Sequence, residues 1–203
     1  MSSPQLGEGQ GLAIGLATAV YITHGDDAGP LLVRSARTGR WMLPAGYMRP
    51  GEDSPLQTAG RMLQEATGLA LQSPAPLLAI DFHPATARAA PYQLMVFDGG
   101  HLTGRRLNSV RLPDRYDRYE TPPFPTLAAL EGTTPLLAEF LKHVRKARTA
   151  YRPVLLQAGR QVSFNGPGGS EKPWDADPAH TDRHVVDDSD YGTGAPLGST
   201  RRA

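Results

Sequence analysis

The 203-residue sequence contains no cysteine. Disulfide bonds, zinc–thiolate sites and cysteine nucleophiles are therefore excluded, and the redox state of the compartment cannot be inferred from the composition. A charge excess is also missing: 21 Lys and Arg residues against 20 Asp and Glu residues give a formal net charge of +1, with both signs mixed along the chain. A basic surface for nucleic acid normally brings a clear positive excess, so we expect no nucleic-acid partner.

Long apolar runs are scarce as well. The run at residues 12–22 is interrupted by Gly15 and Thr18, and it is too short to cross a membrane. The ten residues before it contain Glu8 but no Lys or Arg, so they lack the basic region of a signal peptide. We therefore expect a soluble, cytoplasmic protein that makes no contact with a membrane.

The apolar pattern predicts a single domain at residues 11–160, between a flexible leader at 1–10 and a disordered tail at 161–203. Aromatic residues in the tail stand alone among Gly, Pro, Ser, Asp and Thr, which leaves too little apolar surface to offset the entropy of ordering. Strands before and between two helices predict an α/β fold with α/β/α layers. Strands are expected at 12–23, 31–34, 77–82, 93–97 and 154–156, and helices at 55–66 and 135–148.

The same pattern predicts a hairpin, the end of a strand and the buried face of the first helix. The first two strands flank a strong turn signal and are expected to form a hairpin. Asp98, Gly99 and Gly100 are expected to end the strand at 93–97. In the first helix Leu56, Ala59 and Leu63 recur at helical spacing and are expected to face the core.

Residues 41–69 are the part of the sequence that says most about function. A Pro- and Gly-rich loop is followed by an acidic turn, a helix start at Ser54-Pro55 and a helix end at Gly68. A helix can present two or three carboxylates on one face at spacings of three or four residues. Carboxylate oxygens are the ligands that Mg²⁺ and Mn²⁺ prefer, and such ions neutralise phosphate oxygens and activate water.

This segment resembles the Nudix box, a pyrophosphate-hydrolysing signature written G-x5-E-x7-R-E-U-x-E-E-x-G-U, where U is a bulky aliphatic residue. Its opening matches Gly46 and Glu52, with five residues between them, after a Leu-Pro-Ala-Gly that is similar to the usual Leu-Pro-Gly-Gly. The second half of the box is matched by Arg61, Leu63, Glu65, Gly68 and Leu69. The resemblance covers roughly residues 11–160 and implies a Nudix-like α/β/α sandwich around a mixed β-sheet, in one domain.

Two departures from the box concern its chemistry. Eight residues, rather than seven, separate Glu52 from Arg61. Met62 and Ala66 stand where the family has glutamates, so that Glu65 alone remains of the three helix glutamates used for metal binding and catalysis. One carboxylate gives a weak metal site, although a substrate diphosphate could bring its own magnesium ion.

The resemblance also implies roles for single residues. Glu65 is the expected ligand of Mg²⁺ or Mn²⁺, and Arg61 is expected to bond Glu52 and hold the loop in shape. Family members often take a further carboxylate from a loop well after the box, for which Asp117 and Glu120 are our candidates. The candidates for contact with the substrate are Gly46, Arg34 and Trp41.

Each of these roles has a structural alternative. Arg61 and Glu65 could form a surface helix pair worth about 0.3–0.5 kcal/mol. Trp41 could be a core aromatic, Arg34 an exposed arginine at a strand end, and Asp98 a turn former. His180, Asp182 and His184 in the tail have a spacing that could hold a metal, but such spacing on a disordered segment is usually accidental.

Two classes of function follow. In the first, a Nudix-type hydrolase uses a divalent metal to cleave a nucleoside-diphosphate-linked substrate or a similar phosphoanhydride. In the second, a Nudix-fold module binds a nucleotide-like metabolite or a protein partner without cleaving it. Family resemblance favours the first, whereas Met62 and Ala66 favour the second, because apolar groups there remove the charge that gathers cations. Nudix-like proteins commonly dimerise, so a homodimer is one expected form.

Overall fold

The computed structural model describes residues 14–25, 29–52, 54–87 and 89–162. The leader expected at 1–10 and all but the first two residues of the tail expected at 161–203, including its histidines, lie outside these ranges. The helices and strands are β1 (Gly15–His24), β2 (Gly29–Pro30), β3 (Leu32–Ser35), β4 (Trp41–Met42), β5 (Ala45–Tyr47), α1 (Pro55–Thr67), β6 (Leu77–His83), β7 (Tyr92–Leu102), α2 (Gly104–Leu107), β8 (Tyr116–Glu120), the 3-10 helix η1 (Phe124–Ala129), α3 (Pro135–Ala150), β9 (Val154–Gln157) and β10 (Arg160–Gln161).

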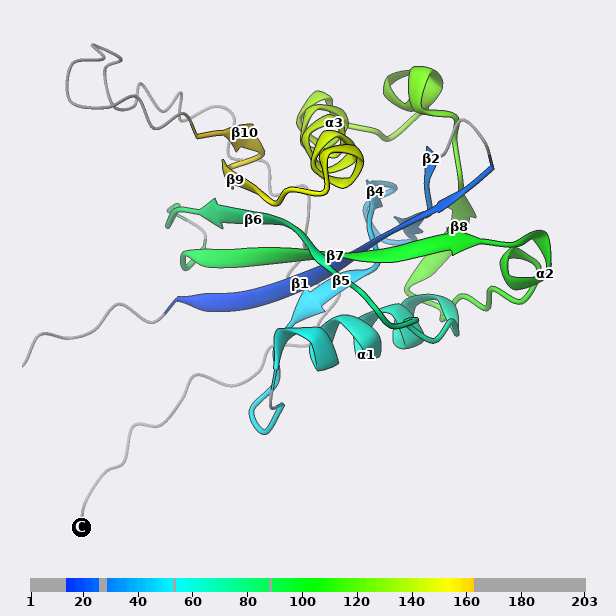
Figure 1. Cartoon of the computed structure of the whole chain (residues 1–203), viewed down its shortest axis with the longest axis horizontal. Helices are drawn as coiled ribbons and strands as arrows, with labels where there is room; N and C mark the ends of the chain where they lie inside the picture. Colours follow the sequence, from blue (N-terminus) through cyan, green and yellow to red (C-terminus); the bar gives the residue numbers. More distant parts are fainter. Residues whose placement is uncertain (1–13, 26–28, 53, 88, 163–203) are drawn as a thin grey trace, which may run out of the picture.

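Two sheets form the centre of the fold. The larger one is 7-stranded, in the order β10-β9-β6-β7-β1-β2 with β5 also paired to β1, and the smaller one has the order β4-β3-β8. The pairs β1–β7 and β6–β9 are parallel, and the other pairs are antiparallel, so the larger sheet is mixed. Helix α3 lies on one side of it and α1 on the other (Figure 1). The α/β fold with α/β/α layers around a mixed sheet is therefore confirmed.

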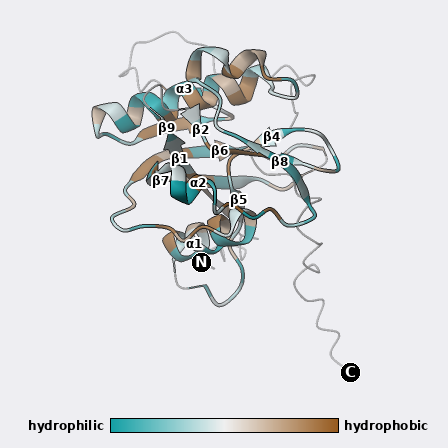
Figure 2. Ribbon diagram, turned by 90° about the vertical axis from the view of Figure 1, so that its right-hand side faces the viewer, coloured by the Kyte–Doolittle hydropathy of each residue, from teal (hydrophilic) through white to brown (hydrophobic). Residues whose placement is uncertain are grey.

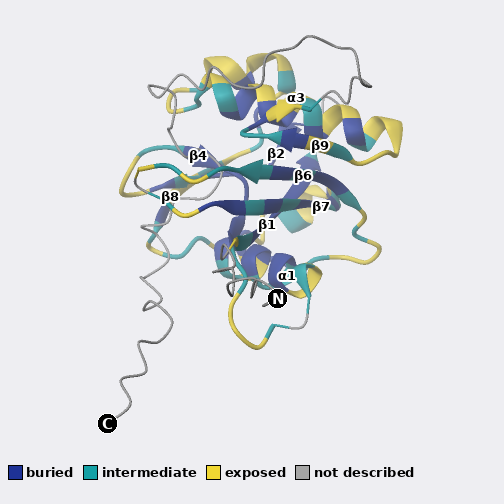
Figure 3. Cartoon of the chain, turned by 90° about the vertical axis from the view of Figure 1, so that its left-hand side faces the viewer, coloured by how far each residue is buried: buried dark blue, intermediate teal, exposed yellow. Residues whose placement is uncertain are grey.

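Strand β1 is buried on both faces because a helix covers each of them. Its side chains alternate between the two faces, as in any strand. Ala17, Ala19 and Tyr21 belong to the cluster that includes Phe140 of α3, whereas Val20 and Ile22 belong to the cluster beneath α1. The inner strands are accordingly buried and the outer surface of α3 is exposed (Figure 3).

Helix α1 starts and ends where its sequence predicts. Ser54 accepts a hydrogen bond from the Gln57 N–H while the Gln57 side chain bonds the Ser54 N–H, which is a complete capping box. Gly68 ends the helix with a φ of 74°, the left-handed conformation that glycine adopts without strain. The prediction for Leu56 was wrong: its side chain is 43% exposed, and it belongs to none of the three buried clusters because it lies in the first turn.

The predicted hairpin is only partly present. Strand β1 pairs with the two residues of β2, but β3 turns away and pairs with β4 and β8 in the smaller sheet. Leu31 still donates its N–H to the Ile22 carbonyl oxygen at 2.7 Å, and β3 begins at the next residue. The chain therefore passes from the larger sheet to the smaller one between Leu31 and Leu32.

The prediction that Asp98, Gly99 and Gly100 end a strand was also wrong, because β7 continues to Leu102. A Cβ atom on Gly99 would lie 2.6 Å from Cγ1 of Val20, so glycine permits the close approach of β7 to β1. Gly100 has a φ of 76° beside a register shift between the two strands. These glycines form an irregularity within the strand rather than its end.

The second half of the chain follows its pattern. Helix α3 and strand β9 form where the sequence predicts them, and Leu137, Phe140, Leu141 and Val144 are buried. Helix α3 carries both hydrophilic and hydrophobic residues, as expected of an amphipathic helix (Figure 2). Residues 101–134, which the sequence left unassigned, contain α2, β8 and η1. No helix in the described ranges combines the length and the apolar content needed to cross a membrane.

Candidate ligand site at helix α1

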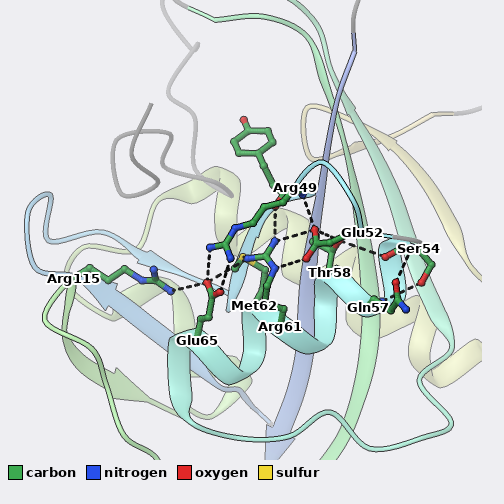
Figure 4. A network of polar contacts seen from close by, with 10 residues as sticks. Arg49, Glu52, Ser54, Gln57, Thr58, Arg61, Met62, Glu65 and Arg115 are labelled. Carbon is green, nitrogen blue, oxygen red and sulfur yellow. Dashed lines mark hydrogen bonds and ion pairs between the residues drawn. The ribbon is translucent and has the colours of Figure 1, made fainter. Parts of the chain in front are cut away.

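The loop between β5 and α1 is fastened to the helix by one ion pair. Arg61 donates from Nε and, at 3.1 Å, from Nη2 to the two carboxylate oxygens of Glu52. Its Nη2 also donates to the Tyr47 carbonyl oxygen, 2.9 Å away. A planar guanidinium suits this two-point contact, which an ammonium group could not reproduce. Arg61 thus joins the helix, the loop and strand β5, as Figure 4 shows for Arg61 and Glu52.

The carboxylate of Glu52 accepts hydrogen bonds from three residues. In addition to Arg61, its Oε2 accepts from the Arg49 N–H at 2.6 Å and from the Thr58 hydroxyl at 2.8 Å. The side-chain bond from Arg61 is the largest cause that lowers the pKa of Glu52 from 4.5 to about 2. The same pair raises the pKa of Arg61. Glu52 is therefore ionised at neutral pH and accepts hydrogen bonds from both the loop and the helix.

The helix glutamate next to this pair is surrounded by arginines. Glu65 contacts Nη1 of Arg49 at 3.1 Å, Nη1 of Arg61 at 3.3 Å and Nη2 of Arg115 at 3.9 Å. The three guanidinium groups converge on it from the loop, from α1 itself and from the residue before β8 (Figure 4). Among these five side chains, three guanidinium groups lie with the two carboxylates of Glu52 and Glu65.

Met62 and Ala66, at the positions where the box has glutamates, face the protein interior. Both are 0% exposed. Ala66 lies in a buried cluster with Val33, Met42 and Tyr116, which come from all three strands of the smaller sheet. This sheet therefore covers the Ala66 position with apolar side chains. Arg61 also donates from Nη1 to the sulfur of Met62 at 3.8 Å.

The other predicted site residues do not come together with Glu65. Asp117 forms an ion pair with Arg34 at 3.5 Å. Glu120 is paired with Leu32 across the strands, and residues opposite each other in a sheet point to the same face. Leu32 belongs to the cluster on the α3 side, whereas Val33 faces α1, so Glu120 is directed away from Glu65.

Two of the residues expected to contact substrate, Trp41 and Gly46, are buried within the fold. Trp41 is 2% exposed, and its Nε1 donates to the Glu131 carbonyl oxygen at 2.7 Å. Gly46 is buried in β5 opposite Thr18 of β1. Arg49 and Arg115, in contrast, were not identified from the sequence. Arg49 lies inside the box and could have been considered, but nothing in the sequence places Arg115 near Glu65.

Comparison with known proteins agrees with this structure. Residues 14–108 match the family model described as NUDIX domain, a range that contains β1, the loop and α1. Together with the fold, this match supports membership of the Nudix superfamily. No curated protein matches the chain at a significant level.

Three solved structures illustrate the likeness. A MutT protein from Methanosarcina mazei Go1 has 21% identity and a TM-score of 0.53, over 68% of this chain and 95% of that chain. A NUDIX hydrolase from Nitrosomonas europaea has 23% identity and a TM-score of 0.54, over 70% and 93%. The NUDIX domain of Shewanella oneidensis NrtR, complexed with ADP ribose, has 18% identity and a TM-score of 0.53, over 68% and 89%. At such identities the likeness concerns the fold alone.

Nudix proteins generally use divalent metal ions, but the residues around Glu65 do not fit one. Mg²⁺ takes six oxygen ligands, and a protein site usually supplies carboxylates. Within the ranges that the structure describes, no three His, Asp or Glu side chains gather as a metal would require. Both oxygens of Glu65 already contact arginines, and the neighbouring helix positions are apolar. The three arginines around Glu65 favour an anion over a cation there.

The lowered pKa of Glu52 gives a prediction for stability. Because the pKa in the folded state is about 2, below the ordinary 4.5, the charged carboxylate stabilises the fold fully above about pH 4.5. This contribution is lost as the pH falls towards 2. We expect Glu52→Gln to be less stable than the parent protein by about 1–2 kcal/mol at pH 7 and equally stable near pH 2. Urea unfolding of both proteins between pH 7 and pH 2 measures the difference, and a difference independent of pH would contradict the assignment.

Proposed function

We propose that this chain binds the phosphate groups of a nucleotide-like small molecule at the arginines around Glu65, without a resident metal ion and with little hydrolysis. The convergence of Arg49, Arg61 and Arg115 on one carboxylate carries this proposal. Guanidinium groups bind phosphate oxygens through paired, charge-assisted hydrogen bonds. Arg49 is 58% exposed, so its guanidinium can turn from Glu65 to a ligand at little cost.

The nature of the ligand is suggested by a relative in fold. The NUDIX domain of NrtR was solved in complex with ADP ribose, a nucleotide-like molecule that contains a diphosphate. A diphosphate offers several anionic oxygens to the three guanidinium groups at this site. The apolar side chains of Val33, Met42 and Tyr116 beneath Ala66 leave no acidic group there to gather cations. ADP ribose is therefore a suitable first probe for binding.

Metal-dependent hydrolysis of a nucleoside-diphosphate-linked substrate is the second candidate. One observation favours it: Glu52 and Arg61, which hold the loop of a Nudix box in shape, remain paired despite the extra residue between them. Glu65 also supplies a carboxylate next to that loop. A substrate that brings its own magnesium ion would need only a few further ligands. The homodimer and the cytoplasmic location expected from the sequence stay predictions.

Calorimetric titration with ADP ribose separates the two candidates. In the first, binding is the same within about twofold in EDTA and in Mn²⁺, and Arg49→Gln weakens it about tenfold because one charge-assisted contact is lost. Arg118→Gln serves as the control, since Arg118 is exposed and takes no part in the contacts around Glu65. Chromatography of the same mixtures detects any nucleoside monophosphate that is released.

Two results would overturn the proposal. Rapid Mn²⁺-dependent release of nucleoside monophosphate, abolished by Glu65→Gln, would establish the hydrolase instead. Equal affinities of Arg49→Gln and the parent protein would show that the arginines around Glu65 do not hold the ligand. If neither ADP ribose nor ATP nor a dinucleotide binds, with or without metal, the proposed phosphate site is excluded.

A further inference from the structure

An open groove of about 360 Å³ lies beside the exposed face of α3, on the opposite side of the large sheet from α1. It is lined by Lys142, Arg145, Lys146 and Thr149 of α3 and by Phe124 of η1. The guanidinium carbon of Arg145 lies 4.6 Å from the centre of the Phe124 ring. Lys142 pairs with Glu139 at 2.9 Å, but within the described ranges neither Arg145 nor Lys146 forms an ion pair with a carboxylate. Arg145 and Lys146 therefore give the groove positive charge that no acid in the described part of the chain compensates.

The net charge of the whole chain is close to zero, but positive and negative residues are unevenly distributed along it. An acidic segment later in the chain could supply carboxylates to the groove. Residues 14–162 contain 17 Lys and Arg against 12 Asp and Glu, a net charge of +5. Residues 171–190 contain two Lys and Arg against seven Asp and Glu, a net charge of −5. This acidic segment also contains Trp174, one of the two tryptophans of the protein.

The acidic segment is attached close to the groove. The described chain ends at Val162, just after β10, and the β9–β10 turn contacts α3: a Cβ atom on Gly159 would lie 3.0 Å from Cδ1 of Leu136. From Leu136 to Lys146 the helix rises about 15 Å. The eight residues 163–170, when extended, span up to about 28 Å. Residue 171 can therefore reach Arg145 and Lys146.

We propose that residues 171–190 lie in the groove on α3 of the same molecule, with their carboxylates against Arg145 and Lys146. Each exposed ion pair contributes only about 0.2–1 kcal/mol, but several act together here. The short connection also gives the segment an effective concentration of the order of millimolar at the groove, so that weak contacts suffice. Because the contacts are electrostatic and exposed, salt screens them.

The accessibility of Trp174 in the full-length protein tests this contact. The other tryptophan, Trp41, is 2% exposed, so quenching of fluorescence by acrylamide, a neutral quencher, reports mainly on Trp174. We expect the quenching constant to rise about twofold between about 20 mM and about 0.5 M NaCl, as screening releases the segment. The double variant Arg145→Gln, Lys146→Gln is expected to show the higher value already at low salt.

Matched variants separate the groove from the overall charge. The double variant Arg105→Gln, Arg118→Gln removes two positive charges from exposed residues elsewhere. Its quenching constant is expected to equal that of the parent protein. We expect the higher quenching constant at low salt also in the triple variant Asp187→Asn, Asp188→Asn, Asp190→Asn. Circular dichroism confirms that each variant is folded.

Three outcomes would overturn the proposal. Quenching in the parent protein that does not change with salt would exclude an electrostatic contact. Equal effects of the groove variant and the control variant would show that charge acts without the groove. Quenching that depends on protein concentration would place the acidic segment on another copy of the chain rather than on its own.

Discussion

Ala66→Glu, which returns to the helix an acid that the family carries, is expected to lower the free energy of unfolding by about 3–4 kcal/mol and to create no metal-dependent activity. Ala66 is 0% exposed and packs against Val33, Met42 and Tyr116. A glutamate there adds a longer side chain to a filled space and places a carboxylate among apolar groups. Urea unfolding followed by circular dichroism measures the loss.

Gln64→Glu is the matched control for this prediction. It adds the same charge to the same helix at an exposed position, so its effect is expected to stay within about 0.5 kcal/mol. If Ala66→Glu proves as stable as Gln64→Glu, and Mn²⁺ raises its melting temperature, the cluster beneath Ala66 opens to water and cations. The proposal that the site holds no resident metal ion would then be wrong.

The parts of the site that the sequence predicts are those decided by neighbours along the chain. The helix limits follow from Ser54, Pro55 and Gly68, whose effects are confined to one turn. The resemblance to the Nudix box implies that Arg61 bonds Glu52, and the structure contains this bond although the loop is one residue longer than in the family. A loop absorbs one residue easily because its backbone is not bound to a regular register.

The parts that could not be predicted depend on strands that return from elsewhere in the sequence. Arg115 precedes β8, in a Pro-rich region whose pattern matches no regular element, and only the pairing of β8 with β3 brings it to Glu65. The same pairing places Tyr116 over Ala66 and directs Asp117 to Arg34. A sequence pattern gives the period of each strand but not its partner, so the surroundings of Glu65 depend on the topology of the smaller sheet.

Arg61→Met is expected to lower the free energy of unfolding by about 2–3 kcal/mol, because it leaves the carboxylate of Glu52 without its main partner. Both side chains are largely buried, with exposed fractions of 20% for Arg61 and 16% for Glu52. Methionine keeps much of the length of the arginine stem, so the loss reflects the guanidinium rather than a cavity. Arg105→Met, at an exposed position of α2, is expected to change stability by less than about 0.5 kcal/mol.

A double-mutant cycle with Glu52→Gln decides whether this pair acts as a structural unit. If Arg61 mainly holds the loop through Glu52, the double variant is expected to be less destabilised than the sum of the two single variants, by about 1–2 kcal/mol. A coupling energy near zero would instead make Arg61 an ordinary partner of Glu65 on the helix surface, worth only about 0.3–0.5 kcal/mol. The loop would then keep its shape through Thr58 and the Arg49 N–H alone, which also bond Glu52. In that case the retained box residues would say little about how the chain binds phosphate.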